Sequence, residues 1–541
     1  MSETYRYAPA ERPLFAGSPF TPVHSGHRRL IYLITGVIVS ISSTFPNALT
    51  TVNVGTISGS LGLYVAEASI LPAVYVALNA SANLTLVKAR AQFGIPQVTG
   101  VLLILYVLAA ALQLAVPVLA TAVLARAVNG LAAAGLVTLG IYYMMQALPP
   151  EARPLGLVAG IGLPQIGTPL ARLIPVDLLA SDHWRGLHLI ELAAALAILA
   201  LITLVRLPPS ERSQAFEPID LVTIGLATAG MLAFTAALGL GRLYWWTDAP
   251  QIGVALAAAI VLLSGAAIIE ACRARPLVHL EWIGTLGIVR FAGVALIVRI
   301  ALAEQTYGSV GLLTAGGLTN DQLHTLFALV ALAMAAGIVV AAATLSERRL
   351  PWQIMVASLI IALGAAIDSN ATSLTRPPEL YLSQSLIGFG TTLFAGPALV
   401  YGFLRMIQRG GDHLVSFVVL FSTTQNVGGL MGSALLGTLQ TIWTRNASNV
   451  FAAQISVGDP QASARLGGGS AALSAVITDP AQRAAQGAGL LGQSIAREGS
   501  IVAFNDTFHL VETLALATAG YLAVHIGVGI WRRRTSSKVA A

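Results

Sequence analysis

The chain alternates between long apolar runs and short polar segments over its whole length. Fourteen runs reach about 18 residues, the length that crosses a hydrocarbon core of roughly 30 Å as a helix. Their centres lie near positions 41, 76, 107, 133, 165, 197, 231, 262, 299, 334, 361, 393, 428 and 519. Because backbone groups in lipid must be hydrogen-bonded internally, this pattern predicts an all-α integral membrane protein with fourteen transmembrane helices.

The spacing of the runs predicts the organisation of the chain. We expect an N-terminal tail (1–29), a six-helix bundle (30–206), an inserted helix pair (207–285), a second six-helix bundle (286–531) and a C-terminal tail (532–541). One long polar loop, 444–502, separates the last two runs. It contains Asp459-Pro460 and Asp479-Pro480, each an N-cap residue followed by proline, which predicts two or three short surface helices. This loop is either flexible or a docking surface.

Composition and charge agree with a membrane location. Hydrophobic residues make up 56% of the 541 residues and charged residues 10%, compared with about 25% charged residues in soluble domains. With a cytoplasmic N-terminus, inner segments hold nineteen of the thirty Lys and Arg, and the short outer loops hold only Arg185, Arg242 and Arg376. The positive-inside rule therefore predicts that both termini are cytoplasmic. Because the basic residues are spread over inner loops and not gathered in a patch, we expect no nucleic-acid partner.

Ionisable residues inside the apolar runs are the first candidate functional residues. Such a residue costs on the order of 2.5–3.5 kcal/mol at the middle of a helix, so it usually faces a partner or a cavity. Arg126 is the only charged residue between Ala91 and Pro150. The others are Arg172, Glu191, Arg299, Glu304 and Glu512. They either fasten helices as ion pairs, or form a site in which a carboxylate beside an arginine changes protonation, as in a proton-coupled transporter.

Polar and glycine-rich stretches inside the runs also allow two interpretations. Residues 40–55, SISSTFPNALTTVNVG, gather Ser, Thr and Asn around Pro46. These side chains either bind neighbouring helices or line a solute cavity. Residues 156–167 and 426–437 are rich in glycine, which allows close helix contact and bending.

The sequence contains no supported catalytic set. HExxH, the phosphate-binding Walker loop and GxSxG are absent from it. The single cysteine, Cys272, excludes an intrachain disulfide and a metal cluster held by cysteines. We therefore expect neither enzymatic activity, nor a metal, nor a cofactor.

Four segments together resemble the major facilitator superfamily, in its fourteen-span drug/proton antiporter branch of the EmrB/QacA type. The resemblance covers most of the chain. LARAVNGLAAAG (124–135) resembles the fourth-span Arg-x-x-x-Gly motif, LTTVNVGTI (49–57) the first-span antiporter motif, LVKARAQFG (86–94) the loop after the second span, and GLPQIG (162–167) the fifth-span Gly-Pro motif. Two positions depart from the family pattern: Ala48 replaces an acidic residue, and Leu163 replaces a glycine.

The resemblance implies a fold of two six-helix bundles plus two inserted helices, and a cavity lined by the first, fourth, ninth and twelfth spans. Arg126 is linked to proton coupling in the family motif. Because Ala48 removes the usual carrier, we expect Glu304 to replace it, steered by Arg299 or Arg126 and accompanied by Glu191. We expect substrate to contact Asn47, Thr50, Asn53, Tyr75 and Arg299. The residues expected to support conformational change are Arg90, Gly94, Gly130, Gly162, Pro164 and Gly167.

The resulting hypothesis is proton-coupled efflux of amphiphilic toxic compounds or drugs across the bacterial inner membrane, driven by the proton-motive force without a cofactor. Two arginines on cavity spans and the missing first-span acid favour anionic aromatic substrates. The alternative is export or import of one dedicated metabolite. FNDTF (504–508), after the long outer loop, is similar to EmrB-like members, which implies a periplasmic adaptor protein and an outer-membrane channel as partners.

Overall fold

The computed structural model describes residues 11, 17–410, 413–456 and 458–539; at 181–183 and 532–539 it describes the backbone alone. Most of the expected N-terminal tail lies outside these residues. The described part of the chain is helical, and its one β-bridge pairs Pro19 with Ser210. Thirteen helical segments of the described chain are long and apolar enough to cross a membrane, and some of them, such as Gly26–Ser60 and Leu286–Ala315, consist of two consecutive helices. This confirms the prediction of an all-α, multi-pass membrane protein.

The first bundle contains the helices before the inserted pair. They are α1 (Gly26–Ser42), α2 (Phe45–Ser60), α3 (Val65–Ala68), α4 (Ile70–Phe93), α5 (Ile95–Ala115), α6 (Leu119–Ala147), η2 (Pro150–Ala152), α7 (Arg153–Gly162), η3 (Leu163–Ile166), α8 (Gly167–Ala171) and α9 (Val176–Leu204). The expected fifth span is divided into α7, η3 and α8. Proline explains the break, because Pro164 and Pro169 have no backbone N–H for a regular helix. No piece of it is long enough to count among the thirteen.

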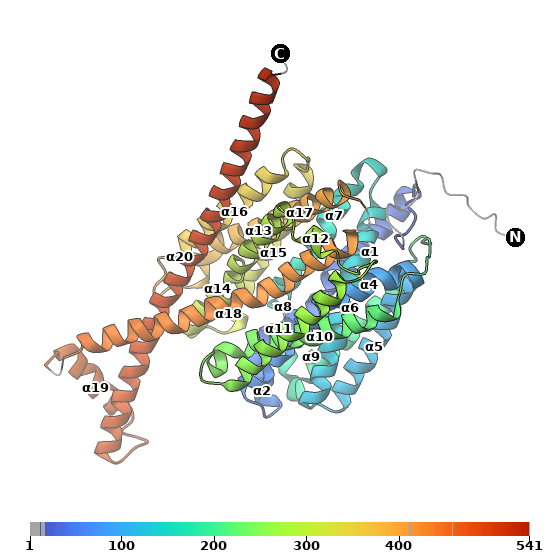
Figure 1. Ribbon diagram of the computed structural model, residues 1–541. Helices are drawn as coiled ribbons and strands as arrows, with labels where there is room; N and C mark the ends of the chain where they lie inside the picture. The colour runs from blue at the N-terminus through green and yellow to red at the C-terminus, as the bar shows by residue number, and fades with distance from the viewer. Residues whose placement is uncertain (1–10, 12–16, 411–412, 457, 540–541) are drawn as a thin grey trace.

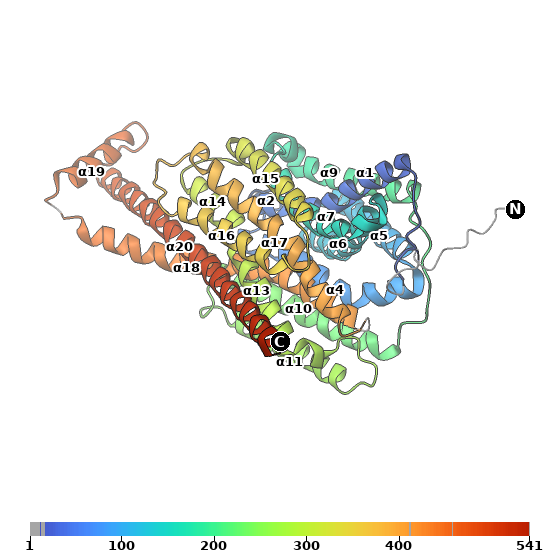
Figure 2. The ribbon, with the colours of Figure 1, turned by 90° about the horizontal axis from the view of Figure 1, so that it is seen from above.

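The inserted pair and the second bundle complete the chain. The pair consists of α10 (Pro218–Tyr244) and α11 (Pro250–Ala271), followed by the short α12 (Leu280–Ile283). The second bundle contains α13 (Leu286–Ala301), α14 (Glu304–Ala315), η4 (Asn320–Leu323), α15 (His324–Ala343), α16 (Leu350–Asp368), η5 (Pro377–Leu380), α17 (Tyr381–Ile407), α18 (Leu414–Gln454), α19 (Pro460–Ala472) and α20 (Pro480–Val539). Figures 1 and 2 show the two bundles side by side.

The molecule has two ends, which we name from the chain. The N-side holds residues 17–25, the turn at Gly94 and the segment 206–217, and α20 ends there too. The far side holds α19 and the loop between α8 and α9 (Figure 1). Each bundle has an apolar core, centred on residues such as Leu103 and Leu139 in the first and Phe394 and Phe417 in the second.

The far-side loop differs from the expectation of two or three separate short helices. Both aspartates do cap helices: Asp459 Oδ1 accepts from the Gln461 N–H at 2.8 Å, and Asp479 Oδ1 accepts from the Ala481 N–H at 2.9 Å. However, α19 is the one separate helix in the described part of 444–502. The adjoining spans α18 and α20 continue into the loop instead, with 41 and 60 residues. At 1.5 Å per residue, α20 is about 90 Å long. The first part of α20, the end of α18 and α19 project together from the far side (Figure 1), and we call them the far-side arm.

Gly130 permits the closest approach of α6 to α4. A Cβ atom added to Gly130 would lie 2.6 Å from the carbonyl oxygen of Tyr75. Because that neighbour is backbone, it cannot rotate away. We predict that Gly130→Ala lowers the thermal midpoint in detergent, since overpacking of this kind costs about 1–3 kcal/mol.

Gly100→Ala on α5 is the matched control for this prediction. An added Cβ there meets nothing within 4 Å, and alanine is favoured over glycine in a helix by about 1 kcal/mol. Its stability should equal or exceed that of the wild type. A Gly130→Ala protein as stable as the wild type would contradict the close packing of α4 on α6.

Candidate functional site

A cavity of about 600 Å³ lies between the two bundles and reaches the N-side. Its walls come from α4, α6 and α7 of the first bundle and from α17 and α18 of the second. Ser18, Thr21 and Arg153 line it on the N-side, and it ends near Thr44 and Tyr75. At this deep end the Thr44 hydroxyl donates to the Pro164 carbonyl at 2.5 Å, within the first bundle.

The walls of the cavity are aromatic and polar, with positive charge. Phe403, Phe417 and Phe421 contribute rings. The charged groups among the described lining residues are Arg90 and Arg153, and no carboxylate is among them. The cavity therefore suits amphiphilic solutes that are neutral or negatively charged, because a cation would meet like charge and no counter-ion.

Arg90 is the more informative of the two arginines. Only 7% of it is exposed, and its Nη1 donates to the Tyr142 hydroxyl at 2.8 Å. The same hydroxyl lies 3.0 Å from Ser18 Oγ. The Nε and Nη2 atoms of Arg90 have no hydrogen-bond partner among the described residues. A buried guanidinium with free donors at a cavity wall is suited to bind an anion.

Contacts between the bundles close the far side. Arg172 Nη1 donates to Asn320 Oδ1 at 3.1 Å, and Asn320 Nδ2 donates back to the Arg172 carbonyl at 3.1 Å. The Arg172 guanidinium also lies over the Phe327 ring, 4.9 Å from its centroid. The Val176 N–H donates to Asp321 Oδ1 at 3.1 Å. Because these contacts join α8 and α9 to η4 and α15, we call them the far-side latch.

Arg126, the lone charged residue of the fourth span, forms a buried ion pair with Glu191. Arg126 Nη2 lies 2.5 Å from Glu191 Oε2, and each side chain is 1% exposed. Glu191 Oε1 also accepts from the Thr50 hydroxyl at 2.9 Å, and Arg126 Nη1 donates to the Pro46 carbonyl at 3.3 Å. The pair therefore joins α2, α6 and α9. Removing either partner would leave an uncompensated buried charge, which typically costs about 3–5 kcal/mol.

Glu304 lies in a different place from the one expected. We predicted that Arg299 or Arg126 steers it, but among the described residues neither arginine forms an ion pair with it. Arg126 pairs with Glu191, and Arg299 Nε donates to the Gln425 carbonyl at 2.9 Å. The break between α13 and α14 at residues 302–303 puts Arg299 and Glu304 on different helices. Being five positions apart, they would also point about 140° away from each other on a continuous helix.

Glu304 shares an amide with a second buried carboxylate, Asp368. Gln384 Nε2 donates to Glu304 Oε1 at 3.0 Å and to Asp368 Oδ2 at 2.6 Å. Glu304 is 0% exposed and Asp368 1%. Glu304 Oε2 and Asp368 Oδ1 have no hydrogen-bond partner among the described residues. Two carboxylates buried without a cation are too costly to keep both ionised, so this carboxylate pair is suited to hold a proton.

The residues expected to bind substrate are dispersed in this structure. Tyr75 lines the cavity. Thr50 contacts Glu191, Asn53 Nδ2 donates to its own helix at the Leu49 carbonyl, and Arg299 lies behind Gln425, which does line the cavity. Asn47 is half-buried on α2 and is not among the lining residues. The first, fourth and twelfth spans line the cavity as expected, but the described residues of the ninth span do not. The second, fifth and thirteenth spans do so instead.

The six residues predicted to support conformational change lie at close contacts between helices or at the cavity. Gly94 has φ +88° in the turn between α4 and α5, a left-handed conformation that favours glycine. A Cβ on Gly162 would meet Ile338 of the second bundle at 2.6 Å, and one on Gly167 would meet Thr44 at 2.2 Å. Arg90 and Pro164 line the cavity, and Gly130 contacts α4.

Two groups of residues at the site were not predicted from the sequence. Asp368 and Gln384 were not singled out, because Asp368 ends an apolar run and resembles a loop residue there. Asn79 and Asn83 of the second span line the cavity, and Asn83 Nδ2 donates to Ser422 of the second bundle at 2.9 Å. Their spacing of four residues on one helix face could have revealed them.

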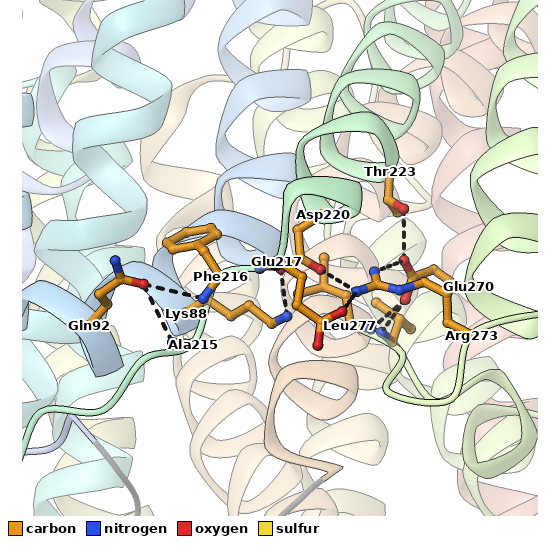
Figure 3. Close-up of polar contacts among 11 residues, drawn as sticks. Lys88, Gln92, Ala215, Phe216, Glu217, Asp220, Thr223, Glu270, Arg273 and Leu277 are labelled. Atoms are coloured by element: carbon orange, nitrogen blue, oxygen red, sulfur yellow. Dashed lines mark hydrogen bonds and ion pairs between the residues drawn. The ribbon is translucent and has the colours of Figure 1, made fainter.

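A network of charges ties the inserted pair to the first bundle on the N-side (Figure 3). Asp220 of α10 is 0% exposed; its Oδ2 lies 2.7 Å from Lys88 Nζ and its Oδ1 lies 2.8 Å from Arg273 Nη2. Arg273 also reaches Glu217 at 2.9 Å and Glu270 at 2.8 Å. Burial opposes the charge of the Arg273 guanidinium, but hydrogen bonds to these three carboxylates raise its pKa and hold it ionised.

The other end of α10 contacts the second bundle. Trp246 Nε1, just after α10, donates to Thr438 Oγ1 of α18 at 2.8 Å, and Arg242 Nη1 donates to the Tyr307 hydroxyl of α14 at 3.3 Å. The polar contacts of α10 thus join it to the first bundle at one end and to the second bundle at the other. The inserted pair therefore bridges the two bundles across the membrane.

Comparisons with known proteins give the fold class. No protein-family model and no curated protein sequence matches the chain. Solved structures match over most of their length. A bacterial homologue of the human drug peptide transporters PepT1 and PepT2 has a TM-score of 0.52 and 12% identity, covering 94% of this chain and 99% of that one.

Two further matches have the same architecture. The human organic anion transporter MFSD10 has a TM-score of 0.51 and 13% identity, covering 91% of this chain and 100% of that one. The major facilitator superfamily proton:xylose symporter XylE has a TM-score of 0.51 and 14% identity, covering 91% and 95%. At these identities the likeness establishes the fold alone. The chain has the major facilitator fold, and membership of the EmrB/QacA branch stays a prediction.

Breaking the far-side latch should favour a state that is open on the far side. Asn320→Ala removes the two hydrogen bonds with Arg172, and we expect a shift of about fivefold to a hundredfold in the ratio of the two states, because each bond contributes about 0.5–1.5 kcal/mol. Spin labels at 64 and 374 report the far side, and labels at 93 and 407 report the N-side. We expect the first distance to lengthen and the second to shorten.

Asn370→Ala provides the control for the latch. Asn370 lies on the same side, and its side-chain Nδ2 donates to the neighbouring Ser369 hydroxyl at 3.4 Å. Both distance distributions should remain as in the wild type. If Asn320→Ala leaves them unchanged as well, the Arg172 contacts do not hold the far side closed.

Proposed function

We propose that this protein is a membrane transporter that works by alternating access, moving a small molecule through the cavity between its bundles. The observation that carries the proposal is the asymmetry of that cavity. It reaches the N-side, and the latch closes the far side. Rocking of two bundles around a central site converts such a state into its opposite. The matched structures are of a peptide transporter homologue, an organic anion transporter and a proton:xylose symporter, which supports the same class of function.

The proposed direction is export across a bacterial inner membrane. The distribution of Lys and Arg favours a cytoplasmic N-side, so this state would take up solute from the cytoplasm. The proposed substrates are amphiphilic toxic compounds or drugs, with a preference for anionic aromatic ones. Arg90 and Arg153 supply positive charge at the wall, and Phe403, Phe417 and Phe421 supply aromatic surface.

The proposed driving force is proton antiport at the carboxylate pair, Glu304 and Asp368. Helix α17 links this pair to the cavity, because it carries Gln384 towards its far-side end and Leu399 and Phe403 in the cavity wall. Pro397 lies between these positions, inside the helix, where proline removes a backbone hydrogen bond and permits bending. Gain or loss of a proton at the pair would thus act on the helix that shapes the cavity.

The far-side arm supports a further part of the proposal. The arm extends well past the bundles (Figure 1), and its helices α18, α19 and α20 offer an exposed surface to a periplasmic adaptor protein. Such an adaptor would pass the solute to an outer-membrane channel. Copurification of an adaptor that is lost when 458–478 is deleted would test this assignment.

Proton release on substrate binding tests the antiport proposal. Purified protein in weakly buffered detergent should release about one proton per molecule when an aromatic acid binds, and Glu304→Gln should reduce the release to background, because an amide cannot ionise. Asp368→Asn should reduce it similarly, because the two carboxylates share one proton. The measurement is a pH-indicator titration with a panel of aromatic acids and lipophilic cations.

Glu512→Gln is the control for proton release. Glu512 is also a carboxylate in a span, but it is partly exposed and lies 3.2 Å from His509 on its own helix. Proton release by Glu512→Gln should equal proton release by the wild type. Undiminished release by Glu304→Gln would remove the proposed carrier. No release with any compound of the panel would favour transport of one dedicated metabolite.

Arg90→Gln tests the charge preference. A hydrogen bond to a charged group contributes about 1.5–3 kcal/mol, so the Kd for aromatic acids should rise about tenfold to a hundredfold. Uncharged aromatic analogues should bind with unchanged Kd, measured by calorimetry. Arg28→Gln, an exposed arginine on α1 outside the cavity lining, should leave both Kd values unchanged. If Arg90→Gln raised the Kd for acids and for neutral analogues by the same factor, an anion-binding role for Arg90 would be contradicted.

A further inference from the structure

A second, smaller cavity lies within the second bundle at its N-side end. It has a volume of about 80 Å³, is lined by α13, α16, α17 and α20, and is open on one side. The polar groups at its rim are Arg290, Tyr401, Arg405, Tyr521 and His525. Below them the walls are apolar, with Phe291, Val294, Ile354, Phe394 and Leu522. The cavity is thus polar at the level where a span ends and apolar towards the membrane interior.

The two arginines at the rim lack a carboxylate partner. Neither Arg290 nor Arg405 forms an ion pair among the described residues, and no acidic residue lines the cavity. The Arg405 guanidinium is held in place: it lies over the Tyr401 ring, 4.8 Å from its centroid. It also reaches α13, where a Cβ on Gly287 would lie 2.7 Å from its Nη1. Positive charge is therefore fixed at the rim.

Helix α17 presents this cavity and the central cavity on different faces. Phe394, Ala398, Tyr401 and Arg405 follow the spacing of one helix face and line the small cavity. Leu399, Val400, Phe403 and Leu404 line the central cavity. The small cavity is therefore a separate site, and it faces the lipid side of the second bundle through α13 and α20.

We propose that the small cavity binds the headgroup and the first part of an acyl chain of an anionic phospholipid. Guanidinium groups donate pairs of hydrogen bonds to phosphate oxygens, and the tyrosine hydroxyls add donors to the glycerol and ester oxygens. Basic pockets between transmembrane helices at the membrane surface suit anionic lipid headgroups. A soluble phosphate ester would meet the same donors but would leave the apolar wall without contact, so the lipid matches the whole cavity.

The proposal does not depend on the proposed transport function. It requires only that the N-side end of the second bundle lies at a membrane surface. A bound lipid would contact α13, α17 and α20 together, and would therefore stabilise their packing. It would also contact the face of α17 opposite to the central cavity.

Native mass spectrometry of the delipidated full-length protein tests the site. The protein is mixed with dioleoylphosphatidylglycerol or dioleoylphosphatidylcholine, and the bound lipids are counted. We expect one tightly retained phosphatidylglycerol in the wild type and about a hundredfold weaker retention in Arg290→Gln/Arg405→Gln, because two charge-assisted contacts are lost. Phosphatidylcholine should be retained weakly by both proteins.

Matched variants distinguish this site from general surface charge. Arg28→Gln/Arg29→Gln removes two arginines from the N-side of the first bundle and should retain phosphatidylglycerol like the wild type. Arg290→Gln alone removes an exposed side chain without touching the Arg405 packing, and should still weaken retention by severalfold. Thermal unfolding in phosphatidylcholine verifies that each variant is folded. Equal retention by the wild type and both cavity variants would overturn the proposal.

Glycerol 3-phosphate distinguishes a lipid from a free phosphate ester. If this soluble ester displaces phosphatidylglycerol at equal concentration, the apolar wall contributes nothing and the assignment to a lipid is overturned. If displacement needs a large excess of the ester, the acyl chain contributes to binding as proposed.

Discussion

The arrangement of this protein depends on one physical constraint, the high free-energy cost of an unpaired charge in hydrocarbon. The constraint explains why a chain with 10% charged residues buries several of them at defined places, each beside a specific partner. Arg126 and Glu191 satisfy it as an ion pair that joins three spans. Glu304 and Asp368 lack a cation and share one amide of Gln384. The first arrangement fastens helices, whereas the second leaves a place for a mobile charge.

Helix α17 connects most of the features that could change during transport. Gln384 contacts the carboxylate pair, Phe403 lines the central cavity, and Arg405 lies at the rim of the small cavity. Pro397 lies inside the helix between Gln384 and the other two residues. Because a single helix carries all three contacts, a change at one place would shift the others without a relay through separate elements.

The sequence predicted the fold well because lipid imposes a simple rule on long apolar runs. Apolar runs of sufficient length identified the spans. The fifth span differs from the expected continuous helix because prolines divide it. The site was harder to predict, since depth along a span does not give rotation about its axis. Arg299 and Glu304 were expected together, but they lie on either side of a helix break and contact different partners, Gln425 and Gln384. Asp368 contacts Glu304 through Gln384, and nothing local to any of these three segments indicates that their helices adjoin.

The continuity of α20 has a mechanical consequence. From Pro480 to Val539 the chain is one helix, whose membrane-spanning part belongs to the second bundle and whose first turns form part of the far-side arm (Figure 1). A helix this long behaves as a lever, so a small tilt of the span is amplified into a larger sweep of the arm tip. The position of the far-side arm outside the membrane would therefore depend on which side of the membrane the central cavity is open to.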